Sequence, residues 1–263
     1  MLIEPMIQQL HQLRLRGMAA GLEQLLRSAQ LQSLSFEERL SVMIQHEITD
    51  RDSKRLSQRL RWAKLPQNAA LEDLDTRTPR GIDPKLIAVL AALTWIKDKL
   101  NVLITGPCGV GKSFIASALA HAACRADYSV RSFRLPRLIE ELARHHAQAN
   151  RSAFLKQLAK VDLLYIDDFG LSPLSDQSKR DLLEILEDRY DKKSTLITSG
   201  SATNLSLFLG SGSVRSSVYD SFLSQFPCSG ESATQSDRPK AGQKRLFHAA
   251  SCFAGFSSGS ITK

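Results

Sequence analysis

Apolar residues recur at helical spacing near the N-terminal end of the chain. Over residues 1–29 they stand three or four positions apart, a pattern typical of an amphipathic helix, at Leu2, Ile3, Met6, Ile7, Leu10, Leu13, Met18, Leu22 and Leu25. Gly17 and Gly21 weaken the middle of this helix without ending it. We therefore predict a first helix over about residues 1–29.

A second helix is predicted over residues 35–63. It begins with the sequence SFEE at 35–38, in which a serine and a glutamate three positions later form a capping box. Its first half is apolar on one face, and its second half is not. Residues 1–66 are accordingly predicted to form a small, all-helical N-terminal region, and a polar connector rich in Asp, Thr and Pro follows at 67–83.

Strand and helix patterns alternate from residue 84 to residue 199. Apolar or alternating runs predict strands at 102–105, 128–135, 161–170 and 194–199, and helical spacing predicts helices at 84–97, 112–123, 136–147, 151–160 and 175–190. Strands that alternate with helices pack as a parallel sheet covered on both faces. The predicted fold class of 84–199 is therefore α/β.

The remaining residues, 200–263, have no sustained helical or strand period. Residues 201–263 hold fifteen serines and six of the 11 phenylalanines but only three acids, and a packed core is hard to build from such a composition. We expect an irregular tail and hypothesise that it is translated out of frame after a shift near codon 200. A natural serine-rich tail is the alternative, and reading the encoding DNA in another frame would decide between them.

A glycine-rich loop follows the strand predicted at 102–105. In GPCGVGKS, at 106–113, glycines let successive backbone N–H groups turn toward a phosphate group, and the loop leads into a helix N-terminus. The spacing fits the Walker A pattern, in which the lysine reaches the β- and γ-phosphates and the last hydroxyl ligates Mg²⁺. A glycine-rich turn before a helix is the alternative. We predict that ATP and Mg²⁺ bind here, through Gly106, Pro107, Cys108, Gly109, Val110, Gly111, Lys112 and Ser113.

Two acids, Asp167 and Asp168, lie near the end of the strand predicted at 161–170. Because the carboxyl edge of a parallel sheet lies beside such a loop, Asp167 is predicted to hold Mg²⁺ with Ser113, directly or through water. Asp168 is predicted to orient the attacking water, which gives Asp168 and Lys112 the catalytic roles. A solvent-exposed acidic turn is the alternative.

Other polar residues near these strands have more than one interpretation. Thr198 and Ser199 could contact phosphate or water, or simply end the last strand. His145 and His146 lie in a polar helical stretch without a partner acid or metal spacing, so we interpret them as surface histidines.

Basic residues gather in the second half of the helix predicted over 35–63. Six positive side chains stand against one acid, Asp52, within residues 51–64: Arg51, Lys54, Arg55, Arg59, Arg61 and Lys64. The formal net charge of the chain is +8 and its pI is near 9.5, which favours an acidic partner such as nucleic acid. We predict that these six residues contact DNA phosphates and that Trp62 stacks or wedges beside them. A solvated helix face would explain the same charges.

Cysteine usage and hydropathy favour a reducing, cytoplasmic setting. The four cysteines, Cys108, Cys124, Cys228 and Cys252, lack the close pairing of a zinc site, and the N-terminal end has no signal-peptide core. No run approaches the roughly 18 apolar residues of a membrane span, so no membrane partner is expected. Cys108 is interpreted as a small filler in the loop, with redox sensitivity as the alternative.

These motifs together resemble the IstB-like ATPases, transposition helpers related to bacterial helicase loaders of the DnaC type. The resemblance covers about three quarters of the chain and is carried by LRLRGMAAGLEQLL at 13–26, GPCGVGKS at 106–113, LLYIDDFGLSPL at 163–174, EDRY at 187–190 and STLITS at 194–199. It implies a P-loop NTPase fold of the AAA+ type. It also implies a protein that forms a homo-oligomer on double-stranded DNA with ATP bound and recruits or stimulates a transposase.

The sequence departs from that family after Ser199. The family has Asn or Gln at the sensor position that follows, where this chain has Gly200, and then a helix whose Asp-Arg pair supplies an arginine finger, which is not recognisable here. Arg189 is interpreted as structural and not as a substitute. Because arginine fingers are worth about 10³ to 10⁵ in rate, we expect nucleotide binding to survive and oligomer-dependent hydrolysis to be lost.

Four functions are compatible with these features. The first is an ATP-dependent, DNA-binding helper ATPase of transposition. The second is a helicase loader, which a pull-down of replicative helicase without transposase would favour. The third, a metabolic P-loop phosphotransferase, fits the basic helical N-terminal region poorly and would consume ATP in response to a metabolite but not to DNA. The fourth is a non-catalytic DNA-binding remnant.

Overall fold

The computed structural model describes residues 3–28, 34–74, 84–170, 174–200 and 247–248. The chain groups into two compact units, Met1–Arg61 and Trp62–Lys263. Residues just after the division belong to the second unit, where Ala63 and Ala69 are buried. The sequence analysis instead placed this division within the connector at 67–83. The hypothesis of a frame shift concerns residues that lie, apart from Gly200 and 247–248, outside the described part of the chain.

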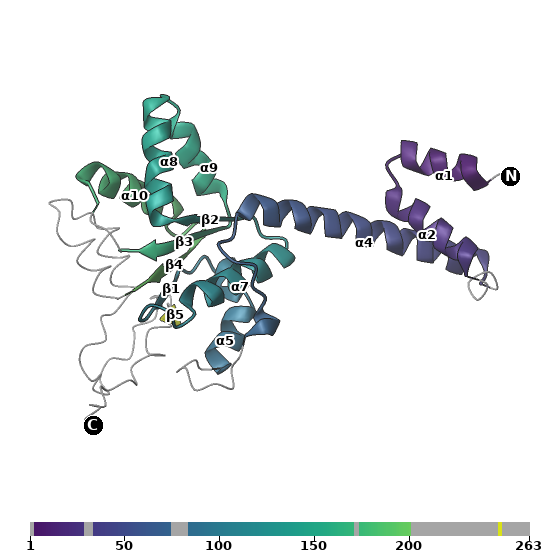
Figure 1. Cartoon of the computed structure of the whole chain (residues 1–263), viewed down its shortest axis with the longest axis horizontal. Coiled ribbons are helices and arrows are strands. Elements are labelled where there is room, and N and C mark those ends of the chain that lie inside the picture. Colours follow the sequence, from purple (N-terminus) through teal and green to yellow (C-terminus); the bar gives the residue numbers. More distant parts are fainter. Residues whose placement is uncertain (1–2, 29–33, 75–83, 171–173, 201–246, 249–263) are drawn as a thin grey trace, which may run out of the picture. The chain divides into compact units, whose positions relative to one another are not determined.

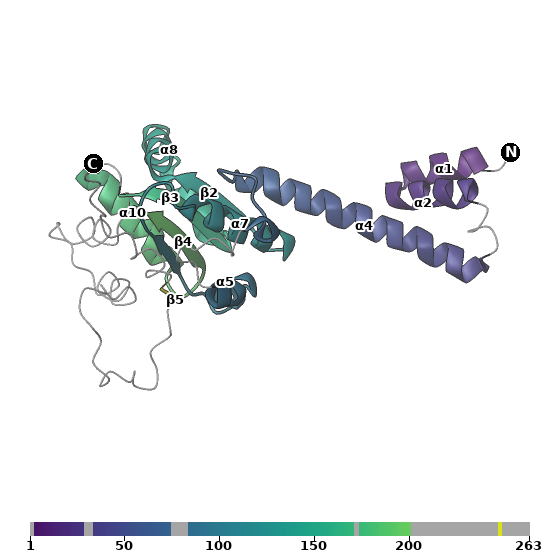
Figure 2. The same cartoon turned by 60° about the horizontal axis from the view of Figure 1, so that its bottom comes forward.

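The first unit is helical, as predicted. It contains α1 (Ile3–Gln12), α2 (Arg16–Arg27) and most of α4 (Phe36–Ala63), and α1 and α2 lie beside the first half of α4 (Figures 1 and 2). The prediction of one continuous helix over 1–29 is wrong, because the chain leaves the helical conformation between α1 and α2. Arg14, in that break, has a left-handed backbone with a φ of 61°.

Two glycines allow α2 to lie close against α4. A Cβ atom on Gly17 would stand 2.5 Å from both the Cα atom of Glu47 and the carbonyl oxygen of His46. The carboxylate of Glu47 also accepts a hydrogen bond from the backbone N–H of Met18 at 3.1 Å. Gly21 is less tightly placed, since a Cβ atom added to it would stand 3.2 Å from its nearest neighbours. The glycines therefore mark a helix contact and not a weak point within a helix.

The start of α4 has the predicted capping box. The Ser35 hydroxyl accepts a hydrogen bond from the backbone N–H of Glu38 at 3.3 Å, and the Glu38 carboxylate accepts one from the backbone N–H of Ser35 at 2.8 Å. Each side chain thus satisfies a backbone donor that the first turn of the helix leaves without a partner.

The second unit is built on a parallel sheet. Its main strands are β1 (Val102–Thr105), β2 (Val130–Arg134), β3 (Leu163–Phe169) and β4 (Ser194–Ser199), in the spatial order β2-β3-β4-β1. A two-residue strand, β5 (Phe247–His248), pairs in parallel with the outer side of β1. This arrangement confirms the predicted α/β class.

Helices cover both faces of the sheet, as Figures 1 and 2 show. On one side lie α5 (Pro84–Ala91) and α7 (Lys112–Arg125); on the other lie α8 (Leu135–Ala147), α9 (Arg151–Lys160) and α10 (Asp176–Arg189). A short α6 (Thr94–Lys97) and a 3₁₀ turn, η1 (Leu71–Asp73), complete the unit. The single helix predicted over 84–97 is wrong, because Leu93 adopts a left-handed conformation and separates α5 from α6.

Side chains alternate between the two faces of β3, as the period of two in a strand requires. Leu164 and Ile166 belong to a core that also contains apolar residues of α8, α9 and α10. Tyr165 and Asp167 point to the opposite face, toward the serines of α7. Both faces are buried, which explains why this strand is an almost continuous apolar run in the sequence.

Arg189 is structural, as the sequence analysis proposed. Its side chain is buried and donates to the carbonyl oxygens of Leu158 at 2.6 Å and Val161 at 2.8 Å, to Ser194, and to the Thr195 hydroxyl at 3.2 Å. Burial lowers the pKa of Arg189 to about 10. The guanidinium therefore joins the end of α9 to the start of β4.

Candidate nucleotide site

The glycine-rich loop lies between β1 and α7. Gly109 and Gly111 have φ angles of 83° and 95°, in the left-handed region that residues with a side chain rarely adopt, and Gly111 is the N-cap of α7. In such a turn successive N–H groups can face the same side and form a concave site for an anion. The helix N-terminus adds further unpaired donors and a partial positive charge.

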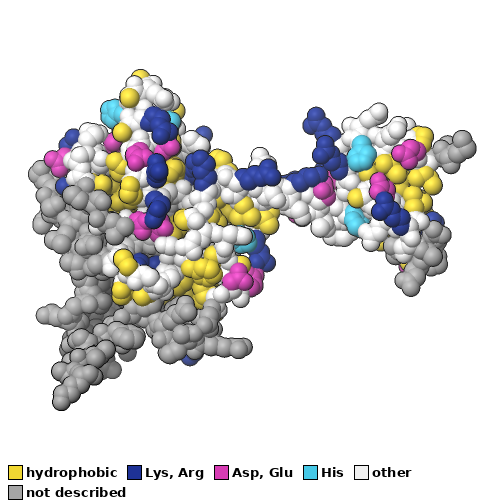
Figure 3. All heavy atoms as spheres, in the orientation of Figure 1, with side chains coloured by type: hydrophobic (Ala, Val, Ile, Leu, Met, Phe, Trp, Pro, Cys, Tyr) yellow, Lys and Arg dark blue, Asp and Glu magenta, His cyan; other side chains and the backbone are white. Residues whose placement is uncertain are grey.

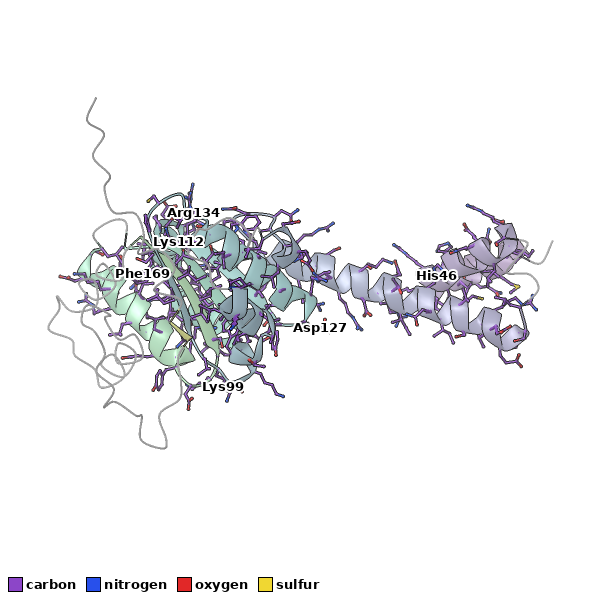
Figure 4. The ribbon with its side chains drawn as sticks, turned by 90° about the horizontal axis from the view of Figure 1, so that it is seen from below. His46, Lys99, Lys112, Asp127, Arg134 and Phe169 are labelled. Atoms are coloured by element: carbon purple, nitrogen blue, oxygen red, sulfur yellow. The ribbon has the colours of Figure 1, made fainter. Side chains whose placement is uncertain are left out.

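Lys112 is the first residue of α7. Its ammonium group donates to the carbonyl oxygen of Pro107 at 2.7 Å, so the side chain folds back over the loop. Figure 4 shows Lys112 at the same end of the unit as Arg134. A charge held there can attract a phosphate group seated in the loop.

Ser113 and Asp167 meet at the carboxyl edge of the sheet. The hydroxyl of Ser113 donates to Oδ1 of Asp167 at 2.9 Å, although 54 positions separate the two residues. Asp167 is only 3% exposed, and its Oδ1 atom also accepts a hydrogen bond from the buried Thr198 hydroxyl. A hydroxyl and a carboxylate, completed by phosphate oxygens and water, are the ligands that Mg²⁺ prefers at a nucleotide. The residues present therefore fit a metal-bound triphosphate.

A β-bulge redirects the second acid. The register between β3 and β4 shifts between Ile166 and Phe169, and Asp168 within this bulge has a φ of 57°. Its Oδ2 atom accepts hydrogen bonds from Arg134 at 2.9 Å from Nε and 2.8 Å from Nη2. Asp168 is thus held in an ion pair beside the loop. Its predicted role in orienting water remains a prediction.

Sequence reasoning missed two residues that support this edge and left a third undecided. Thr198 was left with two interpretations, but its hydroxyl donates to Asp167 and accepts from the backbone N–H of Asp168 at 3.3 Å. Arg134 and Tyr165 were not singled out. Burial raises the pKa of Tyr165, and nearby Asp167 raises it further. A signal was available for Thr198 and Arg134, because both are polar residues near the ends of predicted strands.

Other predicted residues lie away from this edge or have structural contacts. Ser199 donates to the carbonyl oxygen of Phe169 at 2.9 Å inside the sheet. His145 stacks on Phe154 and contacts the Asn150 side chain. Cys108 is exposed on the loop and forms no disulfide.

A basic cavity of about 510 Å³ adjoins the site. Four cationic side chains and two carboxylates are among its lining residues, which are Lys64, Pro66, Gln67, Ser113, Arg131, Ser132, Phe133, Arg134, Arg137, Glu141 and Asp167. Arg131 lies over the Trp62 ring, with its Cζ atom 5.4 Å from the ring centroid. Trp62, predicted to stack or wedge at DNA, is therefore already stacked with an arginine of the same unit.

The predicted DNA-contacting residues lie along the second half of α4 or just after it. Acidic side chains accompany several of them: Arg51 pairs with Glu47 at 2.7 Å, Lys54 pairs with Asp50, and Arg55 lies 3.7 Å from Asp52. Figure 3 shows dark blue Lys and Arg side chains along this part of the helix. Counting charges within 51–64 alone overlooked Glu47 and Asp50, so the local excess of positive charge is smaller than predicted.

Comparison with known proteins places this site in a family. The family described as IstB-like ATP binding protein matches residues 8–225. The chain belongs to the IstB-like ATP-binding protein family. The match extends past Ser199, where the sequence analysis placed the departure from the family, and ends before residues 226–263.

Individual relatives carry names of the same kind. A Pseudomonas fluorescens protein named as an ATP-binding protein of insertion sequence IS1162 is 46% identical over 200 residues, which cover 76% of this chain and 87% of that protein. A Sinorhizobium fredii protein named as an insertion sequence ATP-binding protein is 43% identical over 199 residues, covering 76% of this chain and 81% of the relative. Among solved structures, the DnaC helicase loader matches 52% of this chain and 72% of its own, with 27% identity and a TM-score of 0.41.

The IstB-like chain has the parallel α/β sheet and the phosphate loop of a P-loop NTPase, as the resemblance implies. Its phosphate loop follows β1, its strands run in the order β2-β3-β4-β1, and helices cover both faces. Within the described ranges, no group of three or more His, Cys, Asp or Glu side chains could hold a metal ion. None of the helices in this part of the chain is long and apolar enough to cross a membrane.

Proposed function

We propose that this protein binds ATP with Mg²⁺ in the loop between β1 and α7. The observation that carries the proposal is the hydrogen bond between Ser113 and Asp167, because it joins the end of the phosphate loop to the acidic end of β3. The left-handed glycines and the ammonium of Lys112 on the same loop support it.

Each side chain has a distinct task in this proposal. The backbone N–H groups of the loop bind the phosphates, and Lys112 exchanges its bond to Pro107 for one to a phosphate oxygen. Ser113 and Asp167 would hold Mg²⁺, which neutralises phosphate charge when bound. Thr198 orients Asp167, and Arg134 sets the position of the Asp168 carboxylate. Asp168 would orient the water that attacks the terminal phosphate.

We further propose that the protein acts on duplex DNA as a helper ATPase of transposition. The names of its relatives, ATP-binding proteins of insertion sequences, support a role in an insertion sequence. At 3.6 residues per turn, the five basic residues from Arg51 to Arg61 fall within an arc of about 160° on α4. A row of cations on one face of a helix suits the DNA backbone. The proposed partner is a transposase, which the protein recruits or stimulates, and oligomer formation on DNA is part of the same proposal.

Salt-dependent DNA binding, measured with and without ATP and Mg²⁺, tests the DNA-binding part. Replacing Arg55, Arg59 and Arg61 by glutamine should make the dependence of log K on log salt shallower by roughly 3, since each lost phosphate contact removes about 0.9. A variant with Arg27, Lys156 and Arg180 replaced by glutamine changes the net charge equally. If the two variants behave alike, only the total charge matters and the proposed contact surface is wrong.

The nucleotide and the partner are tested separately. Lys112→Ala should remove the effect of ATP on DNA binding while leaving the nucleotide-free affinity unchanged. Pull-down with the transposase of an insertion sequence should recover that enzyme in the presence of ATP. Recovery of a replicative helicase alone would instead assign the protein to helicase loading.

A further inference from the structure

Two buried hydroxyl groups lie directly behind the proposed metal site. Ser113 and Ser117 stand one turn apart on α7, so both lie on the same face of that helix. Tyr165 and Asp167 stand two positions apart on β3 and share one face of the strand. The pair Ser113 and Asp167 is joined by a hydrogen bond, and the pair Ser117 and Tyr165 lies one layer deeper.

The deeper pair makes no hydrogen bond of ordinary length in the described structure, although polar side chains lie near the Tyr165 hydroxyl. Tyr165 and Ser117 are each 0% exposed, and neither the phenol oxygen of the first nor the hydroxyl oxygen of the second makes a hydrogen bond within the described ranges. Buried hydroxyl groups almost always find a partner, and those that do not require an explanation. Two such groups at one place, beside a predicted ligand, suggest that a polar arrangement forms there in another state of the site.

The surroundings of Tyr165 point to Asp167 as that partner. On the sheet its neighbours in register are Ser132 and Leu196. The hydroxyl of Ser132 already donates to the carbonyl oxygen of Lys64 at 2.6 Å, and Leu196 is apolar. The polar side chains that interact with the Tyr165 hydroxyl are those of Asp167, Ser117 and Ser113. Of these, the carboxylate is the strongest acceptor.

We propose that Tyr165 is a positioning residue of the metal site, whose hydroxyl donates to Asp167 when Mg²⁺ is bound and is itself oriented by Ser117. The proposal depends on the proposed binding of ATP with Mg²⁺. Two hydroxyls already donate to Asp167, those of Ser113 and Thr198, and both donate to the same oxygen atom, Oδ1. A third donor fixes the rotation of the carboxylate. Groups that orient a metal ligand in this way typically change metal affinity by about 10- to 100-fold.

The test uses the full chain with Tyr165→Phe, which removes one oxygen and keeps the ring in the core. Mn²⁺, a paramagnetic substitute for Mg²⁺, is titrated against the ATP-bound protein, and its free concentration is followed by electron paramagnetic resonance. ATP affinity is measured separately in EDTA. We expect metal affinity to fall by about 10- to 100-fold, while metal-free ATP affinity stays within about twofold of the wild-type value.

Two other variants separate positioning from folding. Ser117→Ala should weaken metal affinity in the same direction but by less, because it removes only the group that orients Tyr165. Tyr128→Phe removes a phenol oxygen elsewhere in the unit and should leave metal affinity unchanged. Melting temperatures provide a further readout. We expect Tyr165→Phe to reduce the upward shift caused by ATP with Mg²⁺ and not the melting temperature of the free protein.

The outcomes distinguish this inference from the function on which it depends. If wild-type protein takes up no ATP, the proposed function fails. If wild-type protein binds ATP and metal but Tyr165→Phe and Ser117→Ala bind metal equally well, the positioning role is overturned and the function stands. An equal loss of ATP affinity in EDTA would also overturn it, because the residue would then support the whole loop and not the metal.

Discussion

The close contact of α2 with α4 gives a prediction whose size follows from two glycines on the same helix. In Gly17→Ala the new Cβ atom would stand 2.5 Å from the Cα atom of Glu47 and from the carbonyl oxygen of His46. Ordinary contacts begin at 3.4 Å, so the helices must separate by about 0.9 Å (3.4 − 2.5). Figure 4 labels His46 on α4, in the N-terminal unit.

The expected cost is the clash less the gain in helix propensity. Overfilling a packed interface costs typically 1 to 3 kcal/mol. The upper part of this range, about 2 to 3 kcal/mol, applies to Gly17→Ala because the atoms that would be struck are backbone, which cannot turn aside. Alanine gains about 1 kcal/mol over glycine inside a helix. We therefore expect Gly17→Ala to destabilise the packing of α2 on α4 by about 1 to 2 kcal/mol. In Gly21→Ala the nearest atoms are 3.2 Å away and include the His46 side chain, so the effect should lie near zero.

Amide hydrogen exchange in the full chain measures this local stability. Each 1.4 kcal/mol corresponds to a factor of ten, so peptides covering α2 should exchange roughly 5- to 30-fold faster in Gly17→Ala than in wild-type protein. Gly21→Ala carries the same gain in propensity and serves as the matched control. Slower or equal exchange in Gly17→Ala compared with Gly21→Ala would refute the close approach of the two helices.

Three further predictions concern single side chains of the second unit. Arg134→Ala releases Asp168. Because Arg134 is 65% exposed, stability should change by less than about 1 kcal/mol. ATP turnover should fall, because Arg134 holds the Asp168 carboxylate in position, and unchanged or faster turnover would contradict that role. Arg189→Met leaves the buried carbonyl oxygens of Leu158 and Val161 without their donor. Each such acceptor costs about 1 to 3 kcal/mol, so the free energy of unfolding in urea should fall by roughly 2 to 6 kcal/mol, against less than about 0.5 for the exposed control Arg180→Met. Burial alone would raise the pKa of Asp162, but hydrogen bonds from Lys193 and Ser129 outweigh it and hold this pKa below 3.8. The stability that this carboxylate contributes is present above pH 3.8 and is lost as pH falls through the lowered pKa. The free energy of unfolding of Asp162→Asn should therefore depend less on pH in acid than that of wild-type protein. An unchanged pH dependence would contradict the lowered pKa of Asp162.

Strands and caps were predictable because their signals are local. The run STLITS is a strand over the predicted residues, Ser194–Ser199, and the SFEE sequence forms the capping box that its spacing indicates. Both depend on residues close together in the chain. The breaks at Arg14 and Leu93 were not predictable in this way, because neither position holds a glycine or a proline and each has a left-handed backbone in the fold.

The detailed geometry of the site could not be predicted without knowing the order of the strands in the sheet. The contacts from Arg134 to Asp168 and from Thr198 to Asp167 join residues 34 and 31 positions apart. They form only because β2 and β4 flank β3 and because a bulge redirects Asp168. The motifs identified the ends of the strands, whereas the pairing of these side chains depends on a register that the sequence pattern does not contain.

Calorimetric titration with ATP tests most directly whether Lys112 and Asp167 act on one metal-bound triphosphate. In wild-type protein we expect ATP binding that Mg²⁺ strengthens. Lys112→Ala should weaken ATP binding both in Mg²⁺ and in EDTA, and Asp167→Asn should weaken it in Mg²⁺ alone. Absence of ATP uptake by folded wild-type protein, or an Asp167→Asn variant that binds ATP in Mg²⁺ as tightly as wild-type protein, would contradict the account.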